Sequence, residues 1–259
     1  MRLSHPTVAA ILLLTNTAAL SAQEHPLPVV AADDFEQGAE NWELLDPRSW
    51  RVAHTAEGRV LSQHRKDSDY KPPHRSPFHV ALLRAPIVTD FEYKVRVKST
   101  HEDYGHRDAC LFFGFQDEAH FYYVHLGKEM DPHANQVFIV NGADRKKIST
   151  KTTKGTPWDD QWHTLRIVRD TQSGSIKVFW DVQREPIMTA SDKTFAWGNV
   201  GVGSFDDTAD FDDVELRGII PKPDPRHGLP IQTPVLRERH LDVPDFQAPE
   251  IDLQLPPDE

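Results

Sequence analysis

The chain has 259 residues, of which 38% are hydrophobic and 27% are charged. Such a composition is ordinary for a soluble globular protein, and the length suits one large all-β domain or two small ones. The formal net charge of −11 argues against nucleic acid and anionic membranes as partners. It does not exclude an acidic glycan bound at a local basic patch.

Residues 1–22 have the pattern of a secretory signal peptide. Arg2 precedes an apolar run over residues 8–14, and small residues occupy positions 18–22. We expect cleavage after Ala22 and an exported protein, periplasmic or extracellular. The apolar run is too short to span a membrane, and no later segment approaches the roughly 18 apolar residues that a span requires, so we expect no transmembrane segment. The single cysteine, Cys110, cannot form an intramolecular disulfide and is expected to be a small buried hydrophobe.

Short apolar segments separated by turn residues follow from residue 29 to about residue 218, and no convincing amphipathic helix interrupts them. The clearest is 91–98, where alternate apolar residues, Phe91, Tyr93, Val95 and Val97, are expected to face the core. Two further segments flank the turn at 170–174 and predict a hairpin. The expected strands begin near residue 29 and continue through 50–54, 59–63, 80–83, 91–98, 109–116, 120–126, 136–141, 163–169, 175–181, 198–205 and 211–216.

This pattern predicts an all-β fold, a two-sheet antiparallel sandwich, for which a jelly roll is the natural form at this length. We place the domain at residues 23–218. Nine of the 20 prolines lie between Pro221 and Pro257, so residues 219–259 are predicted to form an extended or disordered tail. We expect this tail to contact the domain surface or another protein.

Several segments together resemble the concanavalin A-like lectin/glucanase (laminin-G-like) jelly rolls of secreted bacterial proteins. The resemblance covers roughly residues 29–218 and is carried by the segments at 33–36, 41–42, 90–95, 162–169, 178–181, 201–205 and 211–214. It implies the fold, and a function among lectins, glycosidases, lyases and adhesion modules. The acidic strand of the glucanases and the Asn-Ser-Gly strand of the hydrolases acting on 3-keto-glycosides are missing. The Gln-x-His strand of alginate lyases is not matched, because Gln116 and His125 belong to different predicted strands.

The stretch from residue 106 to 141 combines core strands with reactive side chains. We expect the inward set to be Leu111, Phe113, Phe115, Tyr122, Val124 and Leu126. Tyr123 and His125 then point to the opposite, concave face, where they and His106 are the catalytic candidates. The ligand-binding candidates around them are Arg75, Arg96, Gln116, Lys128, His133 and Asn135. The same side chains suit sugar binding, β-elimination on a uronate, or plain packing in the core.

Calcium and zinc sites require different ligands. The first and last strands of a jelly roll tend to be neighbours, which would bring Asp33 and Asp34 close to Asp212 and Asp213 as a structural calcium site. The spacing of the histidines does not favour zinc. His106 and Asp108 are a candidate histidine–carboxylate pair, although ordinary solvation of this charged loop is the favoured interpretation. The sequence indicates no other cofactor.

The sequence therefore predicts a secreted or periplasmic carbohydrate-binding jelly roll that recognises a carbohydrate or polysaccharide ligand on its concave face. One alternative is a polysaccharide-active enzyme on the same face, a lyase before a hydrolase. The other is a structural or adhesion module tethered by its tail.

Overall fold

The computed structural model of the protein describes residues 27–226. The predicted signal peptide at 1–22, and the part of the predicted tail from residue 227 onward, lie outside these residues. The described residues up to Lys222 belong to one compact unit. Apart from a single 3₁₀ turn, η1 (Pro47–Ser49), the regular structure in the described residues is all strand. No helix within residues 27–226 is long and apolar enough to cross a membrane.

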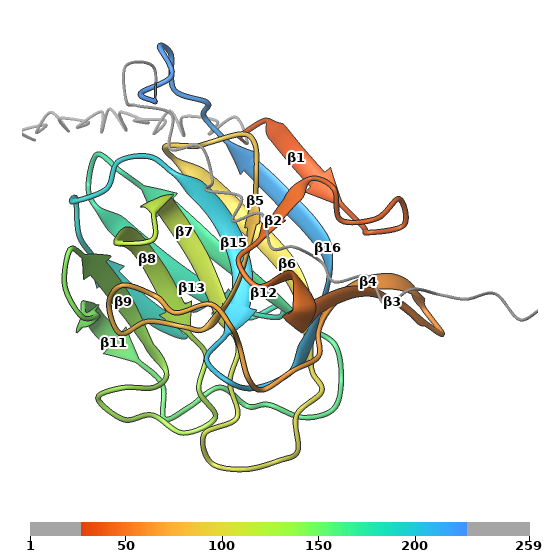
Figure 1. Ribbon diagram of the computed structural model, residues 1–259. Coiled ribbons are helices and arrows are strands. Elements are labelled where there is room, and N and C mark those ends of the chain that lie inside the picture. The colour runs from red at the N-terminus through yellow and green to blue at the C-terminus, as the bar shows by residue number, and fades with distance from the viewer. Residues whose placement is uncertain (1–26, 227–259) are drawn as a thin grey trace, which may run out of the picture. The chain divides into compact units, whose positions relative to one another are not determined.

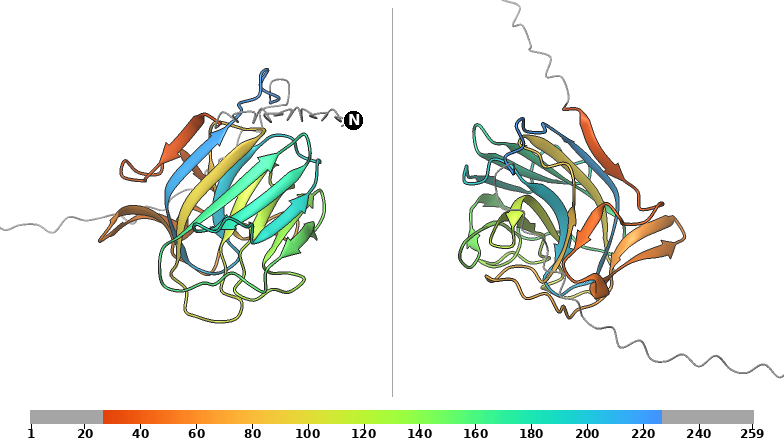
Figure 2. Two further views of the ribbon diagram at one scale, coloured as in Figure 1. Left: turned by 180° about the vertical axis from the view of Figure 1, so that it is seen from behind. Right: turned by 45° about the horizontal axis from the view of Figure 1, so that its top comes forward.

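The strands form two antiparallel sheets, which confirms the predicted sandwich (Figure 1). Sheet A has the order β11-β14-β13-β12-β6-β16-β4-β3, with β1 also paired to β16. Its members are β1 (Val29–Asp33), β3 (Trp50–Thr55), β4 (Gly58–Gln63), β6 (Phe91–Ser99), β11 (Ser149–Thr152), β12 (His163–Asp170), β13 (Ser175–Trp180), β14 (Met188–Ser191) and β16 (Ala209–Gly218). Figure 2 (left) faces this sheet, with β6 in yellow between β12 in teal and β16 in blue.

Sheet B has the order β10-β9-β8-β7-β15-β5-β2. Its members are β2 (Trp42–Leu44), β5 (His79–Leu83), β7 (Cys110–Asp117), β8 (His120–His125), β9 (Gln136–Asn141), β10 (Lys146–Lys147) and β15 (Asn199–Ser204). The stretch that combines core strands with reactive side chains therefore supplies three adjacent strands of one sheet, β7, β8 and β9.

The main core lies between the sheets and follows the predicted alternation. Phe91, Tyr93, Val95 and Val97 of β6 are at most 2% exposed. From sheet B, the inward residues of β7 and β8 join them as predicted: Leu111, Phe113, Tyr122, Val124 and Leu126.

Phe115 was predicted to face the same core, and this was wrong. It packs on the opposite face of sheet B, beside Phe112 and Phe121. The cause is a bulge in β7, where Gly114 has a φ of +56° and the pairing with β8 shifts between Phe113 and Asp117. The extra residue reverses the direction of the side chains that follow it.

A second irregularity divides the edge of sheet A beside β16. The first residues of β16, up to Phe211, pair with β4, where Phe211 is opposite Leu61. From Val214 onward β16 pairs with β1, where Val214 is opposite Asp33. Between these two partners the register with β6 shifts, and Asp213 takes a φ of +45°. The strand thus changes neighbours at Asp212 and Asp213.

The outer face of sheet B is not open to solvent. A second apolar cluster covers it: Val80, Leu82, Cys110, Phe112, Phe115, Phe121, Tyr123, Phe138, Val140 and Phe205. The connection between β4 and β5, orange in Figure 1, passes over this cluster and packs Tyr70 against it. The backbone N–H of Arg75 on this connection donates to Asp144 (2.9 Å), which ties the connection to the turn after β9. We call this the covered face.

Candidate functional site

The two principal catalytic candidates lie on the face of sheet B that was predicted for them, but that face is covered. Tyr123 is 0% exposed and His125 is 6% exposed. The Tyr123 hydroxyl accepts a hydrogen bond from Arg145 (3.0 Å), and the Arg145 guanidinium lies over the rings of Phe138 and Phe205. Burial raises the pKa of Tyr123 above its ordinary value. Such a phenol is a packing group with a satisfied polar end rather than an exposed proton donor.

His125 is held at both ring nitrogens. It stands directly opposite Cys110 in the β7–β8 ladder. Its Nδ1 lies 2.8 Å from the carbonyl oxygen of His133, and its Nε2 lies 2.5 Å from Oδ2 of Asp108. The histidine–carboxylate pair is therefore His125 with Asp108. The proposed pair of His106 with Asp108 was wrong, because His106 is exposed and its ring lies against Tyr104 instead.

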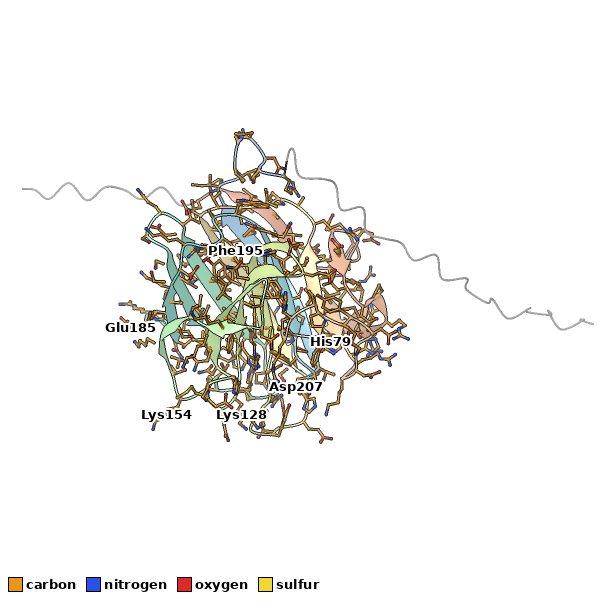
Figure 3. All side chains as sticks on the ribbon, turned by 60° about the vertical axis from the view of Figure 1, so that its left-hand side comes forward. His79, Lys128, Lys154, Glu185, Phe195 and Asp207 are labelled. Carbon is orange, nitrogen blue, oxygen red and sulfur yellow. The ribbon has the colours of Figure 1, made fainter. Side chains whose placement is uncertain are left out.

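Besides His125, Asp108 has an acidic neighbour, Asp207, on the turn between β15 and β16. Asp207 is fully buried; it accepts the backbone N–H of Asp108 (2.7 Å) and the hydroxyl of Tyr104 (2.7 Å). Burial raises the pKa of Asp207, and the negative charge of Asp108 raises it further. Asp207 and Lys128 lie at the same end of the molecule in Figure 3.

The predicted ligand-binding residues do not converge on Tyr123 and His125. Arg96 is on β6 and belongs to sheet A, so its expected place beside them was wrong. Asn135 is fully buried and has a structural role, since its side chain bonds Thr152, Thr153 and Thr156. The remaining candidates are dispersed over loops and strand ends: Arg75 is exposed, Gln116 donates to the Trp197 carbonyl, Lys128 pairs with Asp103, and His133 is exposed.

An open concavity lies on sheet A instead. It is a groove of about 550 Å³ beside the point where β16 changes neighbours, and we call it the sheet-A groove. It is lined by Ala32, Asp33, Asp34, Gln37, Asn41, Lys94, Arg96, Thr164, Asp213, Val214 and Glu215. Most of these side chains carry hydrogen-bonding groups.

Arg96 is the central cation of the sheet-A groove. Its guanidinium donates to Asp213 (2.9 Å) and to Glu57 (2.9 Å), and it lies 4.8 Å from the ring centroid of Trp162. Burial raises the pKa of Asp212, and the charges of Asp213 and Asp34 add to this while Arg96 opposes it. The groove thus holds fixed charges of both signs, and the half-buried indole of Trp162 lies against the guanidinium of Arg96.

Of the four aspartates predicted to bind calcium, Asp33 on β1 and Asp212 and Asp213 on β16 come from paired strands, as expected. Asp33 accepts the Phe35 backbone N–H (2.9 Å) and the Trp42 indole N–H (3.0 Å). Asp212 accepts the backbone N–H of Asp213, and the nearby cation is Arg96. These carboxylates are thus engaged with groups of the protein, and calcium at this place stays a prediction.

Three functional features escaped the sequence reasoning. Asp207 follows the strand predicted at 198–205, and nothing in its local pattern indicates that it would bond the backbone before β7. Arg145 lies in a turn of charged residues, and its stacking on Phe138 requires the three-dimensional fold. Trp162 was noted only as part of the hairpin. Its position beside Arg96 follows from the β6–β12 pairing of Arg96 with Thr164, which a correct strand order would have predicted.

No protein-family model matches the chain, and no curated protein matches it in sequence. Solved structures do resemble it. A protein of unknown function with a galectin-like fold from Bacillus subtilis has a TM-score of 0.52 at 10% identity, covering 76% of this chain and 99% of that one. A mutant of the GH43 protein BlXynB from Bacillus licheniformis has a TM-score of 0.50 at 13% identity, covering 73% of this chain and 39% of that one.

The carbohydrate binding module CBM66 from Bacillus subtilis has a TM-score of 0.49 at 19% identity, covering 69% of this chain and 96% of that one. At these identities the likeness to the galectin-like protein and to BlXynB concerns the fold alone. It agrees with a jelly-roll sandwich.

Proposed function

We propose that the protein is a carbohydrate-binding jelly roll of the concanavalin A-like type, and that it binds its glycan in the sheet-A groove. The observation that carries this proposal is the groove itself: an open concavity lined by carboxylates, carboxamides and cationic side chains, with the Trp162 ring against the guanidinium of its lining residue Arg96. The covered face, where the sequence placed the ligand, is a packed layer of buried apolar and aromatic side chains in which Tyr123 is 0% exposed.

The chemistry of the sheet-A groove suits a sugar. Hydroxyl groups both donate and accept, so a sugar is recognised by carboxylates and carboxamide oxygens together with N–H donors. The groove supplies acceptors at Asp34 and Glu215, and donors at Lys94 and Arg96. An indole offers an apolar face against which the C–H face of a pyranose ring packs.

The proposal is tested by measuring binding of the purified chain to a panel of neutral and uronate oligosaccharides. Arg96→Gln should weaken binding at least about tenfold, since losing a charged hydrogen bond costs about 1.5–3 kcal/mol. Arg166→Gln is the matched control. Arg166 lies on the same face, pairs with Glu92 (3.2 Å) and stacks on Phe179, yet does not line the groove. Absence of binding across the panel by a folded chain, or equal effects of both variants, would overturn the proposal.

The enzymatic and adhesive alternatives remain predictions. Incubation of the same panel with the chain, followed by assays for unsaturated products and for reducing ends, distinguishes binding from lyase and hydrolase activity. Export of the protein is likewise a proposal that rests on residues 1–22. Cell fractionation and sequencing of the mature amino terminus test it, with cleavage expected after Ala22.

A further inference from the structure

We propose that Asp108, Cys110 and His125 form a binding site for one thiophilic divalent metal ion of the zinc type. The three residues meet where β7 begins and β8 ends. Cys110 and His125 are directly opposite each other in the ladder, and Asp108 precedes Cys110 by two residues. One ligand atom from each lies within 4.8 Å of the others, and all three side chains are buried.

The first independent indication of a ligand is the carboxylate of Asp108. This residue is 3% exposed, and within residues 27–226 its Oδ1 has no hydrogen-bond partner. A buried carboxylate oxygen without a partner costs free energy, so such atoms usually mark a ligand, an ion or a water. The other oxygen, Oδ2, faces the imidazole of His125.

The second sign is the orientation of the His125 ring. Its Nδ1 faces the carbonyl oxygen of His133, which only accepts, so Nδ1 carries a proton. In the neutral ring the lone pair is then on Nε2, directed toward Asp108. Two acceptors 2.5 Å apart repel each other unless a proton joins them or a metal ion binds both. Histidines that bind a metal through one ring nitrogen usually donate the N–H of the other ring nitrogen to a carboxylate, a backbone carbonyl or a water.

The choice of metal follows from the ligand atoms. A thiolate, an imidazole and a carboxylate are all zinc ligands, whereas calcium and magnesium take oxygen ligands only. The two negative charges of a thiolate and a carboxylate also neutralise a divalent ion. An ion in the protein interior needs such neutralisation, because an uncompensated buried charge is costly. The backbone N–H of Asp108 is held by Asp207, so the ligand strand is itself fixed from outside.

Cobalt(II) is the direct probe. The full chain is purified under reducing conditions, stripped with a chelator and titrated with cobalt(II) and then with zinc(II). One equivalent of cobalt should bind and give a thiolate-to-cobalt charge-transfer band, which zinc should abolish by displacement. Zinc should also raise the melting temperature of the chelator-stripped chain by several degrees, since an ion that binds only the folded state stabilises it.

Variants identify the ligands. Cys110→Ser changes one atom; it should remove the charge-transfer band and weaken zinc binding at least tenfold, and His125→Asn should do the same. His163→Asn is the matched control, because His163 bonds Asp159 and Asp181 but has no cysteine beside it. The His163→Asn variant should bind cobalt(II) and zinc(II) as tightly as the wild-type chain does.

The alternative is a doubly protonated His125 paired with a negatively charged Asp108. In that case neither cobalt nor zinc binds the wild-type chain at micromolar concentration and the melting temperature does not move, which would overturn the proposal. Unchanged zinc affinity in a folded Cys110→Ser variant would overturn it as well. The wild-type cobalt spectrum decides the question even where His125→Asn does not fold.

Discussion

Tyr123 shows how a side chain with catalytic chemistry serves packing instead. Its ring stacks on Phe138, with 5.1 Å between the centroids, and its hydroxyl takes one N–H of Arg145. The Arg145 guanidinium in turn lies over the rings of Phe138 and Phe205. The hydrogen bond that it donates to Tyr123 therefore holds this charged group against the apolar side chains of the covered face. The hydroxyl therefore stabilises the fold and does not face a ligand.

Tyr123→Phe should lower the free energy of unfolding by about 1 kcal/mol, because it removes one buried hydrogen bond and leaves Arg145 with an unused donor. Urea denaturation measures the change. Glycan binding in the sheet-A groove should be unaffected, since Tyr123 is on the other sheet. A tenfold loss of glycan affinity in a folded Tyr123→Phe chain would contradict this and restore the covered face as the binding surface.

His79 makes the stability of the protein depend on pH. It is fully buried, and burial lowers its pKa below the ordinary value of 6.5. As the pH falls through about 6.5, His79 therefore binds a proton in the unfolded chain but stays neutral in the folded chain. The contribution of His79 to stability is complete above pH 6.5 and is lost as the pH falls from there through the lowered pKa of the folded state.

Urea midpoints at about pH 7.5 and about pH 5 test this. The wild-type chain should lose stability on acidification, and His79→Gln should lose less, because glutamine can still donate to the Lys66 carbonyl but does not titrate. His54→Gln, an exposed change on β3, should keep the wild-type loss. Equal losses in all three chains would show that His79 is not the group responsible.

At the scale of elements, the strand pattern was predictable where a strand has one polar face. In β6 charged residues alternate with apolar ones, and the inward set was identified correctly. The strands β7, β8 and β9 are apolar on both faces, and such runs indicate strands buried on both sides. The outer face was nevertheless interpreted as an open site. The bulge at Gly114 was not predicted, because the presence of a glycine in a strand does not determine whether its φ is positive.

Strand β15 needs glycine at Gly203 because the backbone of β5 lies against it. A Cβ at this position would stand 1.9 Å from the His79 carbonyl oxygen and 3.0 Å from the Phe112 ring. Gly203→Ala should therefore destabilise the fold by about 1–3 kcal/mol, the usual range for overpacking. Thermal or urea unfolding measures it.

Gly105→Ala is the matched control for this change. Its Cβ would meet only the carboxylate end of Glu129 at 3.2 Å, and that side chain can move. The cost should stay within about 0.5 kcal/mol, as for surface substitutions in general. If Gly203→Ala were as mild as Gly105→Ala, β15 could not be packed against β5 as closely as described.

For the whole molecule, the sandwich followed from the number and spacing of strands, which local patterns reveal. The site did not follow, because it depends on which strands share a sheet. Arg96 and His125 both belong to strands with suitable side chains, but β6 and β8 lie in different sheets. Long-range pairing decides this, and no local pattern encodes it. The sheet-A groove likewise exists only because β1 and β4 pair with different parts of β16.

Charge at this scale predicts which glycans bind. The chain carries a formal charge of −11, and the sheet-A groove is lined by four carboxylates, Asp33, Asp34, Asp213 and Glu215, against two cations, Lys94 and Arg96. A polyuronate would bring further negative charge to an acidic surface, and like charges brought together cost binding energy. Neutral oligosaccharides should therefore bind more tightly than uronates of equal length.

Calorimetric or fluorescence titrations at low and high salt measure this preference. Raising the salt concentration should narrow the gap between the two classes, because it screens the repulsion of the uronate and leaves neutral sugars nearly unaffected. Asp34→Asn removes one groove carboxylate and should improve uronate binding selectively. A wild-type preference for uronates, weakened by salt, would contradict the prediction and would mean that Arg96 and Lys94, rather than the surrounding carboxylates, set the field in the groove.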